Sequence, residues 1–397
     1  MLCARKRISG VDMNIAVTHT TLNVFGGAEK LCLTTIEALK LANHKVTLVT
    51  VEKTDWGSVR KMLGTAIRPD HEVYFTTAKL STRLSHWAIA AAIYIIELLV
   101  VKSRRKYDLI INTYGDLFNS IADIVYVHFP WRATIKYSQI PPITNPEMWN
   151  VYLRLYNSVA SLLDKNNRPV ILTNSRFVKE VVNEFLHRSS IVVHPPVDIE
   201  GLMLPVKKQR RENVVITISG FSPKRRLEGV PYIAKHAKAA RFLMIGKTDV
   251  YSLATLKKLR RLIKILGVKD RVELLTNIPR STLLDLLSRA KVYLHVMPQE
   301  HFGTAIVEAM TSGCVPVVHR SGGPWLDILN EKQGEYGYAY DTPQEAAEFI
   351  KILLTDETTR KCMASAAIER ATTFDKAVFK RKIVRIVEKF HAHKSLN

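Results

Sequence analysis

Two glutamates separated by seven residues, Glu300 and Glu308, stand where an apolar, strand-like segment gives way to a helical pattern. Gly303, Thr304 and Ala305 open the expected helix, where backbone N–H groups have no partner within the helix. A carboxylate on the loop can accept hydrogen bonds from sugar hydroxyls, and one on the helix can bind a ribose diol. The amides between them suit phosphate oxygens. The segment therefore predicts a site for a phosphorylated carbohydrate, with simple helix capping by Glu300 as the alternative.

Two adjacent glycines form a second segment of interest, directly after the first apolar run of the chain. Gly26 and Gly27 precede a helix that we expect from Ala28. Glycines let the backbone approach a ligand closely, and the start of a helix favours an anion. A bare strand-to-helix turn would have the same sequence, so both interpretations stay open here.

The phosphate and metal motifs of several other enzyme classes are absent. Residues 246–248 (Gly-Lys-Thr) are no P-loop, because Arg241 stands where the first glycine belongs. There is no GxGxxG, HExxH or D-x-D, and residues 70–72 and 198–200, the nearest approaches to D-x-D, are expected to be surface or turn carboxylates. The four cysteines lack zinc-site spacing. We therefore expect no metal and no bound cofactor, with protein cations and helix N-termini neutralising any pyrophosphate.

Apolar, β-branched runs alternate with helical patterns along the chain, which is typical of parallel α/β sheets. The expected strands of a first series are residues 14–19, 45–51, 108–112, 123–128, 169–174 and 190–194. After a polar, basic stretch at 207–212, read as the interdomain linker, a second series covers 213–219, 241–245, 271–275, 292–295 and 315–319. Expected helices include 253–266, 282–288 and a long amphipathic one at 376–394. The pattern predicts two Rossmann-like domains in series.

Length and charge bound the function. With 397 residues the chain can bury two hydrophobic cores. Lys+Arg 58 against Asp+Glu 36 gives a net charge of +22, which favours polyanionic partners such as nucleic acid, anionic lipid or a phosphorylated substrate. No nucleic-acid recognition motif accompanies this charge. Nucleic-acid binding is therefore the lesser alternative.

One apolar segment, residues 87–101, raises the question of a membrane. It is shorter than the roughly 20 residues that a spanning helix needs, and Glu97 interrupts it. The cations Lys102, Arg104, Arg105 and Lys106 follow it. A buried helix of an α/β domain is the favoured interpretation, and an in-plane membrane helix with a basic collar is the alternative. The first residues lack the apolar region of a secretory signal.

Together these motifs resemble glycosyltransferase family 4, retaining enzymes of the GT-B fold. The likeness is carried by EHFGTAIVEAM at 300–310, SGGP at 321–324, GGAE at 26–29, TNSRF at 173–177 and HPPVD at 194–198. With VHFP at 127–130, the combination is most similar to mannosyltransferases that extend dolichol-linked oligosaccharides from GDP-mannose.

The resemblance implies an α/β fold of two Rossmann-like domains facing each other across a cleft. The expected parts are an extension at 1–13, an acceptor-side domain at 14–205, a nucleotide-sugar domain at 206–375 and a C-terminal helix at 376–397. We expect that helix to pack back toward the N-terminal domain.

The resemblance also implies roles for individual residues. Glu308 would bind the donor ribose, and Glu300 the hydroxyls of the transferred sugar. The substrate-binding set is completed by the amides of Phe302, Gly303, Thr304 and Ala305, and by Gly26 and Gly27 near the diphosphate. His128 would lie near the transferred sugar and the acceptor.

The sequence departs from the family at one catalytic position. The family has an arginine and, five residues later, a lysine that stabilise the leaving diphosphate. Gly220 and Arg225 stand at these positions here. The charge must then come from Lys224, Arg225 and Arg226, so the expected catalytic residues are His128, Lys224, Arg225 and Glu300.

The resulting expectation is a metal-independent, retaining hexosyl transfer, mannose being favoured. The donor would be a nucleotide-diphosphate sugar, GDP-mannose by preference, and the acceptor a lipid-phosphate-linked or other glycan. The expected location is an anionic membrane surface on the cytoplasmic side, without a nucleic-acid partner. The alternatives are a soluble family 4 enzyme that uses a UDP-hexose and a basic nucleic-acid-binding protein.

Overall fold

The computed structural model describes residues 12–78, 106–115, 122–130, 133–138, 168–202, 211–248 and 252–394. The chain divides into two compact units. Unit 1 comprises the chain up to Asn174, Val178–Pro196 and the chain from Ala377 onward, and unit 2 comprises Ser175–Phe177 and Val197–Lys376. The boundary expected at 205–206, most of the expected linker, the apolar segment 87–101 and residues 102–105 lie outside the described residues.

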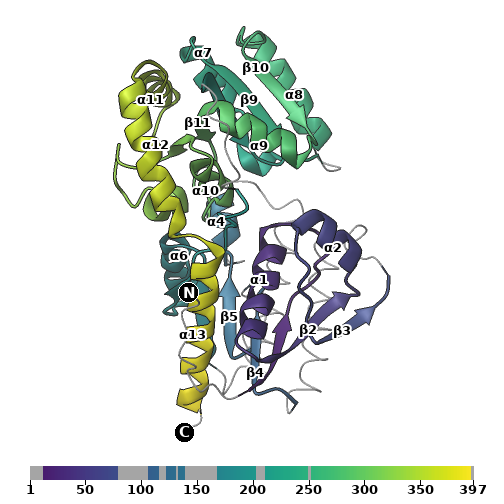
Figure 1. The fold of residues 1–397 in the computed structure, drawn as a ribbon. Coiled ribbons are helices and arrows are strands. Elements are labelled where there is room, and N and C mark those ends of the chain that lie inside the picture. The colour runs from purple at the N-terminus through teal and green to yellow at the C-terminus, as the bar shows by residue number, and fades with distance from the viewer. Residues whose placement is uncertain are drawn as a thin grey trace, which may run out of the picture. The chain divides into compact units, whose positions relative to one another are not determined.

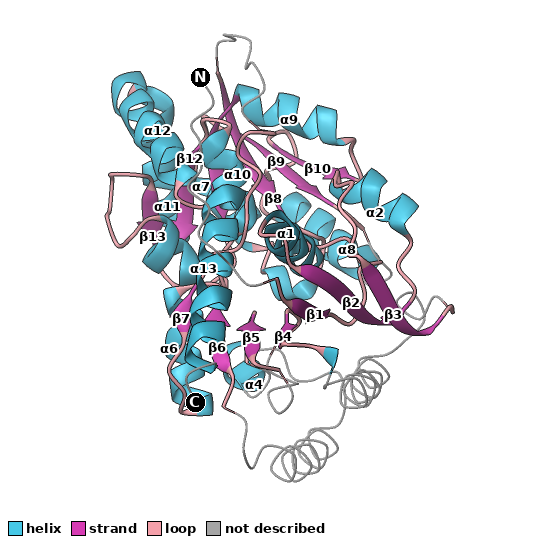
Figure 2. Ribbon diagram, turned by 60° about the horizontal axis from the view of Figure 1, so that its bottom comes forward, coloured by secondary structure: helices cyan, strands magenta, loops and turns pink. Residues whose placement is uncertain are grey.

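Unit 1 contains a parallel sheet whose described strands run in the order β3-β2-β1-β4-β5-β6-β7, visible as one row of arrows in Figure 2. The strands are β1 Asn14–Thr18, β2 Lys45–Glu52, β3 His71–Thr76, β4 Leu109–Asn112, β5 Ile124–Val127, β6 Val170–Thr173 and β7 Ile191–Val192. The helices are α1 Gly27–Leu41, α2 Trp56–Leu63, α4 Thr134–Ser138, α6 Arg176–Leu186 and, from the far end of the chain, α13 Lys376–Lys394.

Helix α13, yellow in Figure 1, contributes to the core of unit 1 although it is the last element of the chain. Its apolar residues Phe379, Ile383 and Val387 are 1–3% exposed and pack in the same cluster as β1, β4 and β5. Lys380 Nζ also lies 3.0 Å from Glu37 Oε1 of α1. The core of unit 1 therefore depends on the C-terminal segment.

Unit 2 contains a second parallel sheet, with its described strands in the order β10-β9-β8-β11-β12-β13. These strands are β8 Glu212–Ile218, β9 Arg241–Gly246, β10 Val272–Thr276, β11 Ala290–His295, β12 Val315–His319 and β13 Tyr338–Tyr340. The helices are α7 Gly229–His236, α8 Ser252–Ile265, α9 Arg280–Arg289, α10 Thr304–Thr311, α11 Pro343–Thr355 and α12 Glu357–Thr372. Figure 1 shows this unit from teal to yellow.

Both faces of the unit 2 sheet are buried, because alternate residues of each strand enter two different clusters. Val215, Phe242 and Val292 belong to the cluster that includes α7, α8 and α11 residues. Their neighbours Ile216 and Leu243 belong to the other, with α10 and α12 residues. This covering by helices on both sides explains why the strands are mostly apolar in sequence, without a strict alternation of apolar and polar residues.

The expected parallel α/β architecture is confirmed, and the expected strands lie within a few residues of those observed. Two strands were missed. β3 has a largely exposed side-chain pattern at the edge of its sheet, so it lacks the apolar signature of a buried strand. β13 spans only three residues. Residues 70–72, expected to be surface or turn carboxylates, lie at the start of this largely exposed edge strand, with His71 and Glu72 inside β3.

Candidate active site

The loop between β11 and α10 carries the first predicted constellation. Gln299 has a φ of 55°, and Gly303, the N-cap of α10, has a φ of 98°. The φ of Gly303 lies in a region that side chains with a Cβ rarely adopt, so this turn favours glycine. A Cβ there would also lie 2.6 Å from Ile306 Cδ1. Glu300 lies beside the helix start, because a Cβ at Gly303 would be 3.7 Å from Glu300 Cγ. Phe302 is buried against Phe374 with ring centroids 5.3 Å apart, which anchors the loop in the core.

Glu300 is surrounded by hydrogen-bond donors although its side chain is only 12% exposed. Oε2 lies 2.9 Å from Arg225 Nη1 and 3.6 Å from His295 Nε2, and Oε1 accepts a hydrogen bond from His301 N at 3.0 Å. Burial alone would raise the pKa of Glu300, but His295 and Arg225 outweigh it and hold the pKa far below its ordinary value. Burial also lowers the pKa of His301. The carboxylate is therefore an ionised hydrogen-bond acceptor at neutral pH.

Arg225 ends the short 3₁₀ turn Pro223–Arg225 that follows β8. Lys224, Arg225 and Arg226 are all exposed, and Arg225 is the one whose guanidinium is bonded to Glu300. Arg226 has a φ of 52° and contributes to the charge around Glu228 instead. Gly220, at the position of the family arginine, has open space where a side chain would begin. The structure thus brings Arg225 to the predicted carbohydrate site.

Glu308 lies on the second turn of α10, as its fifth residue. It is half-buried, and its backbone oxygen accepts a hydrogen bond from Ser312 Oγ at 3.0 Å. Tyr293 is buried within β11, two residues before its end. Burial raises the pKa of Tyr293, and the charges of Glu300 and Glu308 raise it further. Both carboxylates therefore act on the same end of the unit 2 sheet.

A second loop, after β12, fits against the backbone of the Glu300 loop. Ser321 Oγ accepts a hydrogen bond from Gln299 N at 2.8 Å, and Gly323 N donates to Glu300 O at 2.9 Å. A Cβ on Gly322 would lie 2.5 Å from Glu300 O, and one on Gly323 would lie 2.4 Å from His301 O. The two glycines are therefore needed because the loops touch backbone to backbone. Gly322 and Gly323 therefore help to position Glu300, because they allow the two loops to pack closely.

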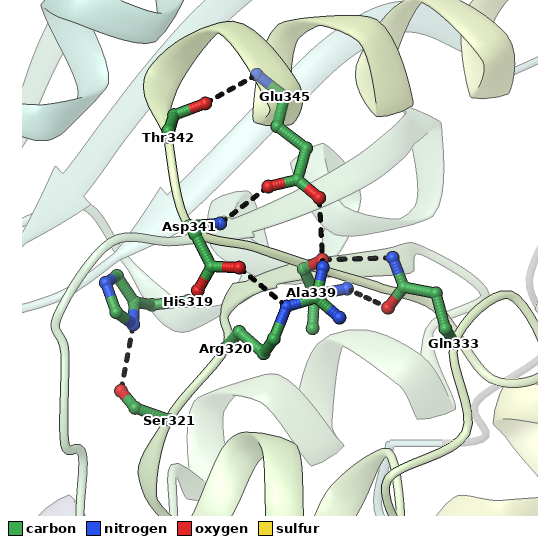
Figure 3. A network of polar contacts seen from close by, with 8 residues as sticks. All are labelled: His319, Arg320, Ser321, Gln333, Ala339, Asp341, Thr342 and Glu345. Carbon is green, nitrogen blue, oxygen red and sulfur yellow. Dashed lines mark hydrogen bonds and ion pairs between the residues drawn. The ribbon is translucent and has the colours of Figure 1, made fainter.

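The base of this second loop is held by the polar network of Figure 3. Arg320 donates to Asp341 Oδ2 at 2.8 Å, to Glu345 Oε1 at 2.9 Å and to Ala339 O at 2.8 Å. Gln333 pairs with both backbone groups of Ala339, and His319 Nδ1 lies 2.8 Å from Ser321 Oγ. The network ties the end of β12 to β13 and the start of α11, so the loop has a rigid base.

The remaining predicted residues lie in unit 1. Gly26 is the N-cap of α1, which begins at Gly27, one residue before the expected start. Gly26 N donates to Glu29 Oε2 at 2.6 Å, whereas Gly27 is exposed with open space around it. His128 directly follows β5, and its Nε2 lies 3.0 Å from Thr113 O. Each unit therefore holds part of the predicted set at the carboxyl ends of its strands.

Sequence reasoning did not single out His295. It is the last residue of β11, 7% exposed, and its ring is stacked on Tyr293 with centroids 6.5 Å apart. A lone histidine at the end of an apolar strand gives no motif. The position could have been suspected only because the carboxyl ends of parallel strands face the binding side of such sheets.

Two observations concern metals and membranes. Among the described residues, no three His, Cys, Asp or Glu side chains converge as a metal-binding group. Within the same residues, none of the helices has the length and apolarity required to cross a bilayer.

The fold and the site together define a class of protein. Residues 198–370 match the family described as "Glycosyl transferases group 1". This segment contains the Glu300 loop, Arg225 and α10, so the similarity to group 1 glycosyltransferases covers most of unit 2. The expected resemblance to glycosyltransferases is confirmed over this segment.

Curated relatives narrow the comparison. The chain is 28% identical over 331 residues to the "GDP-Man:Man(3)GlcNAc(2)-PP-Dol alpha-1,2-mannosyltransferase" of Neurospora crassa, covering 70% of this chain and 58% of that protein. It is 27% identical over 259 residues to the Homo sapiens protein of the same name, covering 58% of this chain and 53% of that protein. The chain therefore spans a little over half the length of these relatives.

Solved structures agree on the fold. A crystal structure of Anabaena Alr3699/HepE in complex with UDP has a TM-score of 0.69 at 19% identity, covering 95% of this chain and 99% of that one. Sucrose-phosphate synthase from Thermosynechococcus elongatus has a TM-score of 0.70 at 16% identity, covering 96% and 99%. The fold is that of the GT-B glycosyltransferases, as expected.

Proposed function

We propose that the protein transfers a mannosyl residue, with retention of configuration, from GDP-mannose to a lipid-linked oligosaccharide. The observation that carries this proposal is the Arg225–Glu300 pair at the start of α10, in the segment that is similar to group 1 glycosyltransferases. A buried, ionised carboxylate next to a guanidinium suits a ligand that presents hydroxyls beside a diphosphate. The names of the curated relatives support mannose, GDP and a dolichol-linked acceptor.

On the donor side, each residue has a distinct task in this proposal. Glu300 accepts hydrogen bonds from hydroxyls of the transferred mannose, and Glu308 binds the ribose diol. Amides from Phe302 to Ala305, at the N-terminus of α10, receive phosphate oxygens, which the helix dipole favours. Arg225, with Lys224 beside it, supplies positive charge to the departing diphosphate.

The transfer itself needs no covalent enzyme intermediate. The bond between mannose C1 and the diphosphate oxygen breaks, and the acceptor hydroxyl forms the new bond to C1 on the same face. The hydroxyl proton passes to the departing diphosphate. Arg225 and the α10 amides lower the barrier by stabilising the charge that develops on that diphosphate. In unit 1, His128 and the Gly26–Gly27 turn orient the sugar, acceptor and diphosphate.

Donor identity is tested by thermal shift. The full chain is heated with GDP-mannose, GDP, UDP-glucose, UDP and ADP-glucose, with EDTA and no added metal. A ligand that binds the native state raises the melting temperature with its affinity. We expect GDP-mannose and GDP to give the largest shifts, and Glu308→Ala to abolish them. Shifts confined to the UDP compounds would overturn the proposed donor.

Acceptor and location are tested by transfer and flotation. We expect incorporation of radiolabelled mannose into Man3GlcNAc2-PP-dolichol in vesicles, with the product sensitive to an α-mannosidase. The net charge of +22 supports binding to the anionic, cytoplasmic face of a membrane. At low salt the protein should therefore float with vesicles that contain phosphatidylserine. With neutral vesicles it should remain in the bottom fraction. If the protein floats equally with both kinds of vesicle, or with neither, the result would argue against binding to an anionic surface.

A second candidate function is a soluble transfer from a UDP-hexose. It is favoured by one comparison, the similar Anabaena structure in complex with UDP. Strong stabilisation by UDP-glucose in the thermal-shift panel, together with the absence of vesicle binding, would support this alternative over mannosyl transfer.

A further inference from the structure

Three polar residues follow neighbouring strands of the unit 1 sheet at the edge where these strands end. His19 comes directly after β1, Thr113 after β4 and His128 after β5. Because β4 lies between β1 and β5, the three are neighbours in space although far apart in sequence. His19 and Thr113 are each 1% exposed, so their polar atoms need partners inside the protein.

The direction of the hydrogen bond between His19 and Thr113 follows from a third group. The Thr113 hydroxyl donates its single hydrogen to Thr18 O at 3.0 Å. It therefore accepts from Nδ1 of His19, also 3.0 Å away. The opposite ring nitrogen, Nε2 of His19, then faces Glu29 Oε1 at 3.6 Å, which is an electrostatic contact and too long for a hydrogen bond. Tyr114 packs edge-on against the same ring, which fixes its plane.

Glu29 extends this network to the diglycine turn. Its Oε2 accepts the 2.6 Å hydrogen bond from Gly26 N that caps α1. A Cβ on Gly26 would lie 2.8 Å from that oxygen, so the short contact needs glycine. Burial raises the pKa of Glu29, but His19 and the Gly26 amide outweigh it, and the pKa is lowered. The carboxylate thus stays ionised while buried.

His128 is attached at the other end of the network. Its Nε2 lies 3.0 Å from the backbone oxygen of Thr113. A carbonyl oxygen has no hydrogen to give, so Nε2 of His128 carries the proton and the tautomer is set. Asn174 Nδ2 donates to His128 O at 2.9 Å, which holds the backbone at the same point. Thr113 therefore touches both histidines, one through its side chain and one through its backbone.

We propose that His19 and Glu29 are positioning residues for the transfer. Together with Thr113 they form one network that fixes the Gly26 turn at one end and the ring of His128 at the other. The inference rests on the proposed function, in which these two ends serve the same reaction. Groups that act on one reacting centre must be held within a fraction of an ångström. Here the buried hydrogen bonds of Thr113 and Glu29, joined by the 3.6 Å electrostatic contact between His19 and Glu29, would provide that constraint.

Two matched pairs of full-length variants separate positioning from mere stability. Glu29→Ala removes the acceptor for Gly26 N, whereas Glu29→Gln retains a side-chain oxygen that can accept it. Thr113→Val removes the hydroxyl next to His19, whereas Thr113→Ser retains it. We expect the Ala and Val variants to lower kcat by about 10²-fold, as small misplacements of reacting groups do, and the Gln and Ser variants to retain most of it.

A buried histidine outside the network provides the control. His44 is 6% exposed and lies before β2, at the opposite edge of the sheet. His44→Gln should change the melting temperature and leave kcat unchanged. If it lowers kcat as much as Thr113→Val does, loss of activity reflects general destabilisation and the proposal is wrong.

A spectroscopic measurement that does not depend on activity distinguishes failure of this inference from failure of the proposed function. Absence of mannosyl transfer by the wild type would count against the proposed function alone. In that case ¹⁵N spectra of histidine side chains decide: the Nδ1–H signal of His19 and the Nε2–H signal of His128 should both move in Thr113→Val. A His128 signal that does not move, or equal kcat in Thr113→Val and Thr113→Ser, would overturn the network.

Discussion

Arg225 Nη1 lies 2.9 Å from Glu300 Oε2, so the two residues assigned to different parts of the donor are already joined to each other. A guanidinium carries five N–H donors in a planar fork, so it can keep this contact and bind a phosphate oxygen as well. The carboxylate likewise has lone pairs left for a hydroxyl. The pair therefore links recognition of the sugar to stabilisation of the leaving group within one cluster.

Replacing Arg225 should separate these two tasks. We expect Arg225→Gln to reduce kcat by about 10²-fold or more, because a preorganised donor to developing charge is lost. Arg225→Lys should recover part of the activity, since lysine restores the charge without the fork. Lys257→Gln removes an exposed cation of α8 and should leave kcat unchanged. Equal activity of Arg225→Gln and Lys257→Gln in steady-state transfer assays would remove Arg225 from the site.

The lowered pKa of Glu300 also predicts how stability depends on pH. Because the pKa is lowered in the folded state, ionised Glu300 contributes stability above its ordinary value of about 4.5, and this contribution is lost as the pH falls further. Arg225→Gln raises the folded-state pKa and so reduces the contribution. The difference in melting temperature between wild type and variant should therefore be full near pH 7 and narrow only as the pH falls through the variant's folded-state pKa toward the lower pKa of the wild type.

The measurement is a series of thermal unfolding curves from neutral to acidic pH for the wild type, Arg225→Gln and Lys257→Gln. Lys257→Gln should follow the wild type at every pH. A gap between wild type and Arg225→Gln that stays constant or widens in acid would contradict the sign of the shift.

The contact between Gly323 and the Glu300 loop predicts a steric effect. A Cβ at Gly323 would lie 2.4 Å from His301 O and 2.7 Å from Phe302 Cα, both backbone atoms that cannot turn aside. Gly323→Ala should therefore cost about 1–3 kcal/mol of unfolding free energy and displace Glu300, with a larger loss of transfer than of stability. Gly220→Ala, which meets nothing within 4 Å, is the control. Indistinguishable denaturation midpoints for the two variants would show that the loops can separate freely.

The parts of the fold that were predicted correctly share one physical property. Buried strands of a parallel sheet are apolar on both faces, so β1, β8 and β12 appear in the sequence as mostly apolar, β-branched runs. β3 was not predicted because most of its side chains are exposed. β13 was not predicted because three residues are too few to show an apolar pattern. Whether a strand could be predicted from the sequence therefore depended mainly on how fully its side chains are buried.

The site was predictable to the extent that its residues are close in sequence. The spacing of Glu300 and Glu308 places both at one helix start, so it could be read directly. His19 and Thr113 are 94 residues apart and meet only because β1 and β4 are neighbours in the sheet. A lone histidine after an apolar strand gives no local signal, and strand order cannot be read from composition. Pairs that depend on topology were therefore missed.

The place of α13 in unit 1 leads to a prediction that connects stability with the site. Phe379 is 2% exposed, and its ring centroid lies 6.5 Å from that of Tyr126, whose own ring lies 5.1 Å from His128. Phe379→Ala leaves a cavity beside Tyr126 and should cost about 3–5 kcal/mol of unfolding free energy. Because the cavity adjoins the support of His128, kcat should fall even at temperatures where the variant stays folded.

Lys382→Ala is the matched change on the exposed face of the same helix. It should alter the unfolding free energy by no more than about 0.5 kcal/mol and leave kcat unchanged. Urea unfolding followed by circular dichroism gives the first quantity, and transfer assays well below the melting temperature give the second. If Phe379→Ala loses stability but retains full kcat, the packing of α13 supports the fold of unit 1 without transmitting order to His128, and the C-terminal helix is then a structural element alone.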